Sequence, residues 1–272
     1  MAPMTEPLRR SVVFLPGGVT PVALSYAPLL VELAAEIDPI LKDLEVYATP
    51  QPPDDYSVLS EVEALRRTVD AAHLDTFHLV GYSGGGAVSL AFAARYPQRL
   101  KSLALFEPAD IPGAWDDEER ESWREFNAAM DNATDEQMLA EFTRLQVRPG
   151  VELPAPRPGP APEWMAARPS GLRAMMRAFE ADETDRAWLR RCHFPVYLGH
   201  GLLTGEYMLH RVQVLAGLLP DIWIEAYPGV HHFAPPQRTQ PAHYADALRA
   251  LWSRAERAET KPAPDGDKTY AA

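Results

Sequence analysis

Hydrophobic and polar positions follow two alternating patterns along most of the chain. Short apolar runs rich in β-branched and aromatic residues occur near 12–15, 44–48, 77–82, 102–106, 195–199 and 222–227. Such runs are typical of strands that are buried on both faces of a sheet. Between most of them, apolar residues recur at three- and four-residue intervals, as in helices with one buried face. The alternation predicts an α/β fold with a mostly parallel sheet of about six strands and helices on both faces.

Helical periodicity is found in five segments of this alternation, over 26–34, 58–69, 87–96, 209–218 and 244–255. At the start of the second segment, Ser60 and Glu63 have the spacing of a capping box. In a capping box, two side chains satisfy backbone N–H groups that the first turn leaves free. We therefore expect these two residues to mark the beginning of that helix.

Residues 110–190 interrupt the alternation. Amphipathic patterns predict helices over 115–130, 134–146 and 171–181, and a proline-rich stretch over 149–162 predicts an extended loop. We expect this insertion to form a helical lid over the carboxyl ends of the strands, where open α/β sheets bind ligands.

The lid divides the predicted core into two parts, residues 11–109 and 191–257. The last segment, 258–272, is rich in alanine, proline, aspartate and lysine, and this composition predicts a disordered tail.

Composition agrees with a single enzyme domain. The chain has 272 residues, of which 46% are hydrophobic, so a sizeable core is available. Its formal net charge of −12 disfavours nucleic acids and anionic membranes as partners. A single cysteine, Cys192, excludes an intrachain disulfide. No run approaches the length of a membrane span and the N-terminus lacks an apolar signal segment, so we expect a cytoplasmic protein.

The strongest chemical motif is Gly-x-Ser-x-Gly over residues 81–85, between a predicted strand and a predicted helix. In this context the turn is a nucleophile elbow, which holds the hydroxyl of its central Ser83 clear of both elements. A free serine hydroxyl is a weak nucleophile, so it needs a histidine to take its proton and a carboxylate to orient that histidine. In elbow enzymes the chain order is serine, acid, histidine.

The histidine is expected after the last strand. Pro228 and Gly229 end that strand, and His231 and His232 follow in the loop. We assign the general base to His232 and keep His231 as the alternate.

Two glutamates compete for the role of the acid. Glu107 directly follows the strand after the elbow, and a carboxylate at the end of a buried strand needs a partner such as an imidazole. Glu206 follows the next strand, beyond Thr204, which occupies the more convenient position for an acid but has no charge. We favour Glu107 over Glu206, with Asp110 as a third candidate.

The oxyanion donors are expected on two loops. One is the backbone N–H of Gly84, and the other belongs to Gly18 or Val19 in the glycine-rich loop after the first strand. The residues expected to line a substrate pocket are Tyr82, Trp115, Trp123, Met175, Met176, Phe179 and His200. The sequence gives no reason to expect a metal site or a cofactor.

With these motifs the chain resembles the α/β-hydrolase family over most of residues 11–257. The resemblance rests on four segments, 15–18, 81–85, 106–108 and 228–233. Pro16 stands where the family usually has the histidine of a His-Gly pair, and Thr204 stands where it often has the aspartate. Some members place the acid one strand after the nucleophile, which favours Glu107. The family typically carries a helical lid after that same strand.

These observations predict a serine hydrolase that acts on a small hydrophobic carboxylic ester, thioester or lactone through an acyl-enzyme. Three alternatives remain open. The same site could transfer the acyl group to an alcohol or amine, or its histidine could serve as the base of a cofactor-free carbon–carbon hydrolase or oxygenase. A non-enzymatic ligand-binding protein on this scaffold is the third, because a fold alone does not establish an activity.

Overall fold

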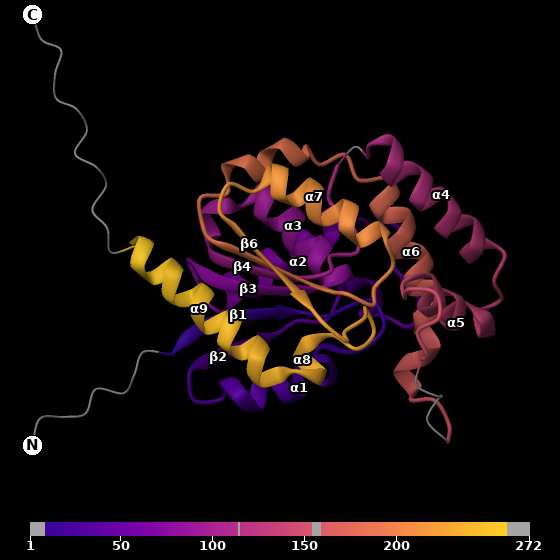
Figure 1. Cartoon of the computed structure of the whole chain (residues 1–272), viewed down its shortest axis with the longest axis horizontal. Helices are drawn as coiled ribbons and strands as arrows, with labels where there is room; N and C mark the ends of the chain where they lie inside the picture. The colour runs from indigo at the N-terminus through magenta and orange to yellow at the C-terminus, as the bar shows by residue number, and fades with distance from the viewer. Residues whose placement is uncertain (1–8, 114, 154–158, 260–272) are drawn as a thin grey trace, which may run out of the picture.

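Six parallel strands form one sheet in the order β2-β1-β3-β4-β5-β6 (Figure 1). The computed structural model describes residues 9–113, 115–153 and 159–259. The strands are β1 (Arg10–Leu15), β2 (Ile37–Leu41), β3 (Phe77–Tyr82), β4 (Leu100–Phe106), β5 (Val196–Gly201) and β6 (Ile222–Tyr227). The strand order places β3, which leads into the serine motif, beside β4 near the middle of the sheet. The predicted parallel sheet of six strands is confirmed.

Helices connect the strands and cover both faces of the sheet (Figure 1). They are α1 (Val22–Leu33), α2 (Val58–Ala71), α3 (Gly84–Arg95), α4 (Asp117–Asp131), α5 (Asp135–Leu145), α6 (Arg168–Glu180), α7 (Tyr207–Leu218), α8 (Pro236–Thr239) and α9 (Pro241–Glu259). The periodicity of 26–34, 58–69, 87–96, 209–218 and 244–255 is confirmed by α1, α2, α3, α7 and α9.

Alternate residues of each central strand pack into two separate cores, as the two-residue period of a strand requires. On β1, Val13 and Leu15 pack with residues of α2 and α3. Val12 and Phe14 point to the other face, where they pack with residues of α1 and α9. Burial on both faces explains why these strands are continuous apolar runs.

One predicted strand and one predicted cap were wrong. Residues 45–47 form a short 3-10 helix, while β2 lies earlier, at Ile37–Leu41. This edge strand contains the exposed Pro39, which has no backbone N–H to donate. Proline is tolerated there because β2 has no second neighbouring strand that would accept a hydrogen bond from that position. The sequence near 44–48 is apolar because Leu44 and Val46 are buried in the core that includes residues of α2, and not because they pair in the sheet.

The capping box of α2 is formed by Ser57 and Ser60, instead of Ser60 and Glu63. The side chain of Ser57 accepts a hydrogen bond from the backbone N–H of Ser60 over 3.2 Å. The hydroxyl of Ser60 accepts one from the backbone N–H of Ser57 over 3.1 Å. Glu63 is instead bound by Arg66 and Tyr96. The box therefore begins three residues earlier than the spacing predicted.

The insertion contributes α4, α5 and α6 between β4 and β5, on the side of the sheet at which the strands end (Figure 1). Helices were expected over 115–130, 134–146 and 171–181, and the structure has all three within a few residues. Asp116 caps α4 and Thr134 caps α5, each in a capping box. The Pro-rich stretch of 149–162 includes residues 154–158, which lie outside the described residues.

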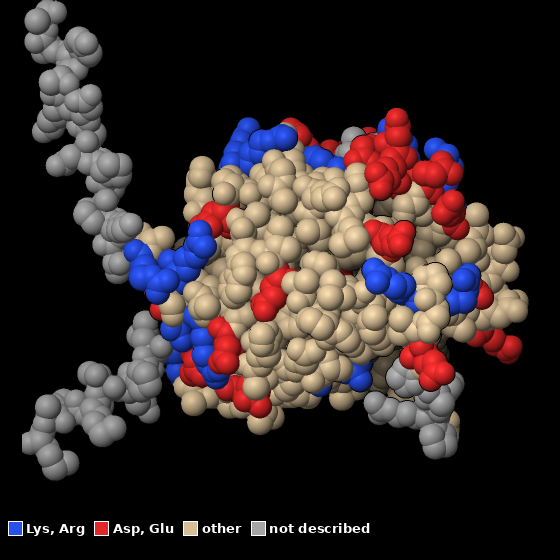
Figure 2. Space-filling model, viewed as in Figure 1, with Lys and Arg blue, Asp and Glu red and all other residues tan. Residues whose placement is uncertain are grey.

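Helix α9 ends at Glu259, so the first two residues of the predicted tail belong to this helix. The remainder, 260–272, lies outside the described residues. None of the helices that the structure describes is both long and apolar enough to cross a membrane. In Figure 2 acidic side chains gather over the start of α4, where Asp116, Asp117 and Glu118 are close together in sequence, while the centre of this face is largely uncharged.

Candidate active site

Ser83 lies in a sharp turn between β3 and α3. Its backbone has φ 52° and ψ −119°, which is strained for a residue with a side chain. Three backbone hydrogen bonds hold the strained turn. The N–H of Ser83 donates to the carbonyl of Phe106 over 3.1 Å, and its own carbonyl accepts from Ala87 over 3.0 Å and from Ala109 over 2.9 Å. The hydroxyl is thereby fixed at the N-terminus of α3, the positive end of the helix dipole.

Glycine is required beside Ser83 because the backbones approach closely. A Cβ atom on Gly85 would lie 2.4 Å from the carbonyl oxygen of Pro16, and one on Gly81 would lie 2.7 Å from the carbonyl oxygen of Gly85. Any side chain would push the helix away from the strands. The Gly-x-Ser-x-Gly motif is therefore a packing requirement of this turn.

Ser83, His232 and Glu107 form a continuous hydrogen-bonded line. Nε2 of His232 lies 2.9 Å from Oγ of Ser83, and Nδ1 of the same ring lies 2.8 Å from Oε2 of Glu107. The ionised carboxylate only accepts, so Nδ1 carries the hydrogen and Nε2 accepts from the serine hydroxyl. All three side chains are at most 4% exposed.

The carboxylate of Glu107 is held by two further donors. Its Oε1 accepts from the backbone N–H of Gly201 over 2.7 Å and from the hydroxyl of Thr204 over 2.5 Å. The residue itself has φ 44°, an uncommon value that directs its side chain away from the continuing chain. A buried anion needs such a full set of donors to offset its desolvation.

The alternate residues lie outside this line. His231 accepts at Nδ1 from the backbone N–H of Phe233 over 3.2 Å, and burial lowers the pKa of its imidazole. Glu206 is exposed at the start of α7. Asp110 is buried and accepts from Nε1 of Trp115 over 3.0 Å. Among the described residues, Glu107 is the only carboxylate in hydrogen-bond contact with His232.

The backbone of His232 and that of the glycine-rich loop each accept a hydrogen bond from a tyrosine hydroxyl. Tyr82 donates its hydroxyl to the carbonyl of His232 over 2.5 Å, and Tyr47 donates to the carbonyl of Gly18 over 2.5 Å. The peptide between Gly18 and Val19 is trans, so its N–H points away from the carbonyl that Tyr47 holds. Gly18 and Val19 border the same small hollow as Ser83 and His232.

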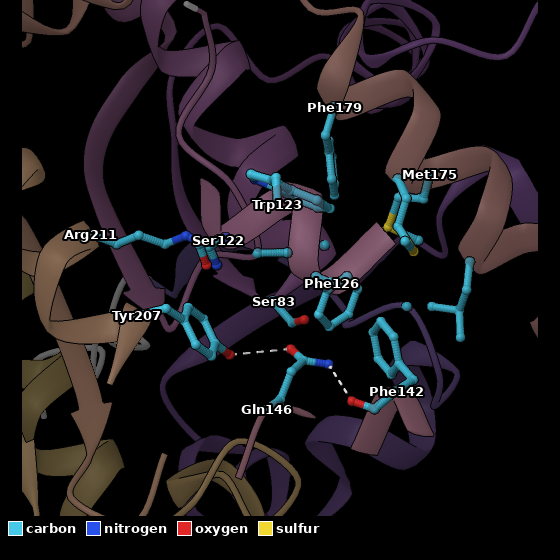
Figure 3. A pocket seen from close by; sticks show the side chains of 15 residues that line it. Ser83, Ser122, Trp123, Phe126, Phe142, Gln146, Met175, Phe179, Tyr207 and Arg211 are labelled. Atoms are coloured by element: carbon cyan, nitrogen blue, oxygen red, sulfur yellow. Dashed lines mark hydrogen bonds between the residues drawn. The ribbon is translucent and has the colours of Figure 1, made fainter. Parts of the chain in front are cut away.

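A narrow cavity opens above Ser83, between the sheet and the insertion (Figure 3). It has about 540 Å³ of atom-free space, part of it open to solvent, but the centre of a water molecule fits in only about 50 Å³. The lining residues are Gly18, Ser83, Gly84, Ala109, Ser122, Trp123, Phe126, Phe142, Gln146, Leu172, Met175, Met176, Phe179, Tyr207 and Arg211. Its walls are mainly apolar and come from α4, α5, α6 and α7.

Of the seven residues predicted to line the pocket, four line this cavity, namely Trp123, Met175, Met176 and Phe179. Tyr82 borders the smaller hollow beside His232. Two predictions were wrong. Trp115 lies behind Trp123, with the rings stacked 5.1 Å apart, and His200 is buried at the end of β5 outside the lining.

Four further lining residues, Phe126, Phe142, Tyr207 and Arg211, were not predicted from the sequence. Phe126 lies one turn beyond Trp123 on α4, so helical spacing from Trp123 was a signal that could have identified it. Tyr207 and Arg211 lie in the first turns of α7, where the predicted apolar pattern rested on other residues. Only the packing of α7 against the insertion brings them to Ser83.

One group of metal-ligating side chains occurs within the described part of the chain. It consists of Asp116, Glu119 and His210, whose ligand atoms lie within 4.8 Å of one another. These side chains already pair with protein groups, since Glu119 binds Arg186 over 2.8 Å and His210 binds Asp116 over 3.0 Å. None of the three lines the cavity above Ser83.

Comparison with known proteins gives one family and several local relatives. A family model described as "alpha/beta hydrolase fold" matches residues 42–188. Monoacylglycerol lipase abhd6-A of Xenopus laevis is 42% identical over 60 residues, which cover 21% of this chain and 18% of that protein. The 2-hydroxy-6-oxo-2,4-heptadienoate hydrolase of Pseudomonas putida is 40% identical over 90 residues, or 32% of each protein. The chain thus matches about a third or less of the length of these curated relatives.

Among solved structures, a hydrolase from Pseudomonas aeruginosa PA01 superposes with a TM-score of 0.67. The two share 20% sequence identity, and the superposition covers 89% of each chain. At 20% identity this similarity shows that the two proteins share a fold, and it shows nothing about their substrates.

Proposed function

The chain belongs to the alpha/beta hydrolase fold family, and on that basis we propose that it is a serine hydrolase of carboxylic esters, thioesters or lactones. The observation that carries the proposal is the line from Ser83 through His232 to Glu107, with hydrogen bonds of 2.9 Å and 2.8 Å. In this arrangement a histidine can accept the serine proton, and a carboxylate orients that histidine. A serine with these two partners is an activated nucleophile.

In the proposed reaction, Oγ of Ser83 attacks the acyl carbon while Nε2 of His232 takes the hydroxyl proton. Glu107 holds the ring and stabilises its cationic form. The N–H groups of Gly84 and of Gly18 or Val19 stabilise the oxyanion. The leaving group receives the proton from His232, and an acyl-enzyme remains on Ser83. His232 then takes a proton from water, the hydroxide attacks the acyl carbon, and the acid product leaves as Ser83 regains its proton.

The walls of the cavity support a small hydrophobic acyl substrate. Trp123, Phe126 and Phe142 contribute aromatic surfaces, and Met175 contributes a flexible apolar side chain. The insertion supplies these side chains, and we propose that it acts as the lid of the site. A chemistry that needs neither metal nor organic cofactor is sufficient for this reaction.

The test is labelling with a small fluorophosphonate, which reacts only with an activated serine. Wild type should be labelled, and Ser83→Ala and His232→Ala should not. Glu107→Gln should be labelled far more slowly than wild type, while Glu206→Gln should react at the wild-type rate. If folded wild type is not labelled, the covalent mechanism is wrong. If Glu206→Gln is the slower glutamate variant, the acid is misassigned.

A cofactor-free carbon–carbon hydrolase is the second candidate. The relative from Pseudomonas putida favours it, because the compound in that protein's name contains no ester bond. Turnover of a vinylogous diketone acid by wild type, with no turnover of simple esters, would favour this candidate. Transfer of an acyl group to an added alcohol in preference to water would instead indicate an acyltransferase, and tight binding without turnover a ligand-binding protein.

A further inference from the structure

Arg211 brings a positive charge into the apolar cavity beside Ser83. It lies on α7, and in Figure 3 it extends toward the cavity from the side on which Ser122 lies, opposite Met175. Most other lining side chains are aromatic or aliphatic. A guanidinium in such surroundings loses part of its hydration, which is costly without compensating partners.

The protein gives this guanidinium few partners. It lies over the ring of Tyr207 at 4.8 Å and over that of Trp123 at 5.8 Å. Its Nη1 donates one long hydrogen bond of 3.5 Å to the carbonyl of Pro108. Within the described residues, no carboxylate forms an ion pair with it. Most of its five N–H donors therefore have no acceptor among the protein groups that the structure describes.

Other arginines of this region are bound differently. Arg186 forms a salt bridge of 2.8 Å to Glu119 and also donates to backbone carbonyls. Arg173 pairs with Asp135 over 2.5 Å. Arg168 also lacks an ion pair, but it is buried against the ring of Tyr47 and is not part of the cavity lining. Arg211 thus differs from them in being a cation that lines the cavity above Ser83 without a paired carboxylate.

One acidic group that interacts electrostatically with Arg211 is a poor counterion. It is Asp110, which is 2% exposed and already accepts from Trp115. Burial raises the pKa of Asp110 to about 7, although Arg211 opposes this increase. Near neutral pH a large share of Asp110 is therefore uncharged. The positive charge of Arg211 remains available to an anion that enters the cavity.

We propose that Arg211 is a specificity-determining residue that binds a carboxylate of the substrate, so that the preferred substrate is an ester carrying one carboxylate on an otherwise apolar chain. This rests on the proposed hydrolase function. A planar guanidinium binds a carboxylate through two parallel hydrogen bonds. A single carboxylate matches Arg211, the one cation among the described lining residues, and the aromatic walls would contact the chain between the two polar ends. This proposal departs from the small hydrophobic substrate predicted from the sequence, because it adds one charged group to the apolar chain.

The test compares monomethyl esters of succinic, glutaric and adipic acid with neutral methyl esters in which an isopropyl group replaces the carboxylate. Wild type should hydrolyse at least one charged ester with a kcat/KM about tenfold above its neutral analogue. Arg211→Met should abolish or invert that ratio, and Arg211→Lys should retain part of it. Arg144→Gln, which removes an exposed arginine of α5, is the control and should keep the wild-type ratio.

Binding to Ser83→Ala separates this inference from the proposed hydrolase function. Calorimetry should show that Ser83→Ala binds a charged ester about tenfold more tightly than its neutral analogue. Ser83→Ala/Arg211→Met should lose the difference, and a wild-type melting temperature of Arg211→Met shows that the loss is not unfolding. A preference for the neutral esters, or an equal loss for both kinds of ester in Arg211→Met and Arg211→Lys, overturns the carboxylate subsite. Charge-selective binding without fluorophosphonate labelling overturns the hydrolase and leaves the subsite standing.

Discussion

Thr204 donates its hydroxyl hydrogen to Oε1 of Glu107 over 2.5 Å, and this bond joins the ends of two neighbouring strands. Thr204 lies in the loop after β5, at the position most convenient for an acid, and Glu107 directly follows β4. The two candidate positions are thus adjacent in space. One supplies the carboxylate, and the other supplies a donor that stabilises it.

This adjacency predicts that the acid can be moved from one strand to the other. Glu107→Asn should lower kcat by about 10³- to 10⁴-fold, because the imidazole loses the group that fixes its tautomer. Asparagine tolerates the φ of 44° at this position. Adding Thr204→Asp should recover at least about tenfold of that loss, since the new carboxylate lies beside the vacated position. Steady-state kinetics of an ester would show it.

Thr204→Asp by itself is the control for this exchange. It places a second carboxylate against Glu107, so it should lower the activity of the otherwise wild-type protein. A double variant that is no more active than Glu107→Asn would show that position 204 does not reach His232 productively.

Tyr47 is expected to position the oxyanion loop. Its hydroxyl holds the carbonyl of Gly18 over 2.5 Å and thereby orients the N–H of Val19. Tyr47→Phe keeps the ring and removes this bond, so it should lower kcat about tenfold with little change in KM or melting temperature. Tyr56→Phe is the matched control, because it removes a hydroxyl that binds Glu61 over 3.0 Å. Equal effects of the two substitutions would contradict the positioning role.

Gly85→Ala should destabilise the fold. The new Cβ would lie 2.4 Å from the carbonyl oxygen of Pro16, a backbone atom that cannot move without shifting β1 or α3. We expect a loss of about 2 kcal/mol or more in the free energy of unfolding, measured by chemical denaturation. Gly217→Ala in α7 meets no atom within 4 Å and should instead stabilise by about 0.5–1 kcal/mol. If Gly85→Ala left the free energy of unfolding unchanged, the turn at Ser83 would have to accommodate the new Cβ atom without strain.

His78 should make the protein sensitive to acid. Burial lowers the pKa of its imidazole from 6.5 to about 4, so between these values the unfolded chain binds more protons than the folded one. The free energy of unfolding therefore falls as the pH drops from 6.5 to 4, by about 3 kcal/mol in total. His78→Asn should remove this part of the decline. Parallel stability curves for the two proteins, measured between pH 7.5 and pH 4, would refute this contribution.

Local patterns were sufficient for much of the architecture. Apolar runs identified the four central strands, because parallel strands buried on both faces need continuous hydrophobic sequences. They also identified the edge strand β6, whose run of β-branched and aromatic residues is apolar although much of it is exposed. The edge strand β2 was missed because one of its sides is unpaired, which permits the exposed Pro39 and removes the apolar signal. Burial against α2 gave the nearby Val46 the appearance of a strand residue.

The hydrogen-bonded line was predicted from chain order together with strand ends. Ser83 stands in a motif that only one backbone turn explains, and His232 follows the last strand. The choice of Glu107 over Glu206 was also made from sequence. The donors on Gly201 and Thr204 that support this carboxylate were not predicted, because they come from the end of β5 and the loop after it, about a hundred residues away.

The amino-acid sequence by itself determined the alternation of strands and helices and the place of the insertion, since each follows from patterns among residues close in the chain. It also located the turn at Ser83 through its motif, although backbone hydrogen bonds to Phe106 and Ala109 help to hold that turn. The tertiary structure alone decided which side chains meet above Ser83. Phe142 on α5 and Arg211 on α7 reach the same cavity only because the insertion packs over the strand ends. Contacts between distant segments depend on the relative placement of whole elements, which the periodicity of each element does not encode.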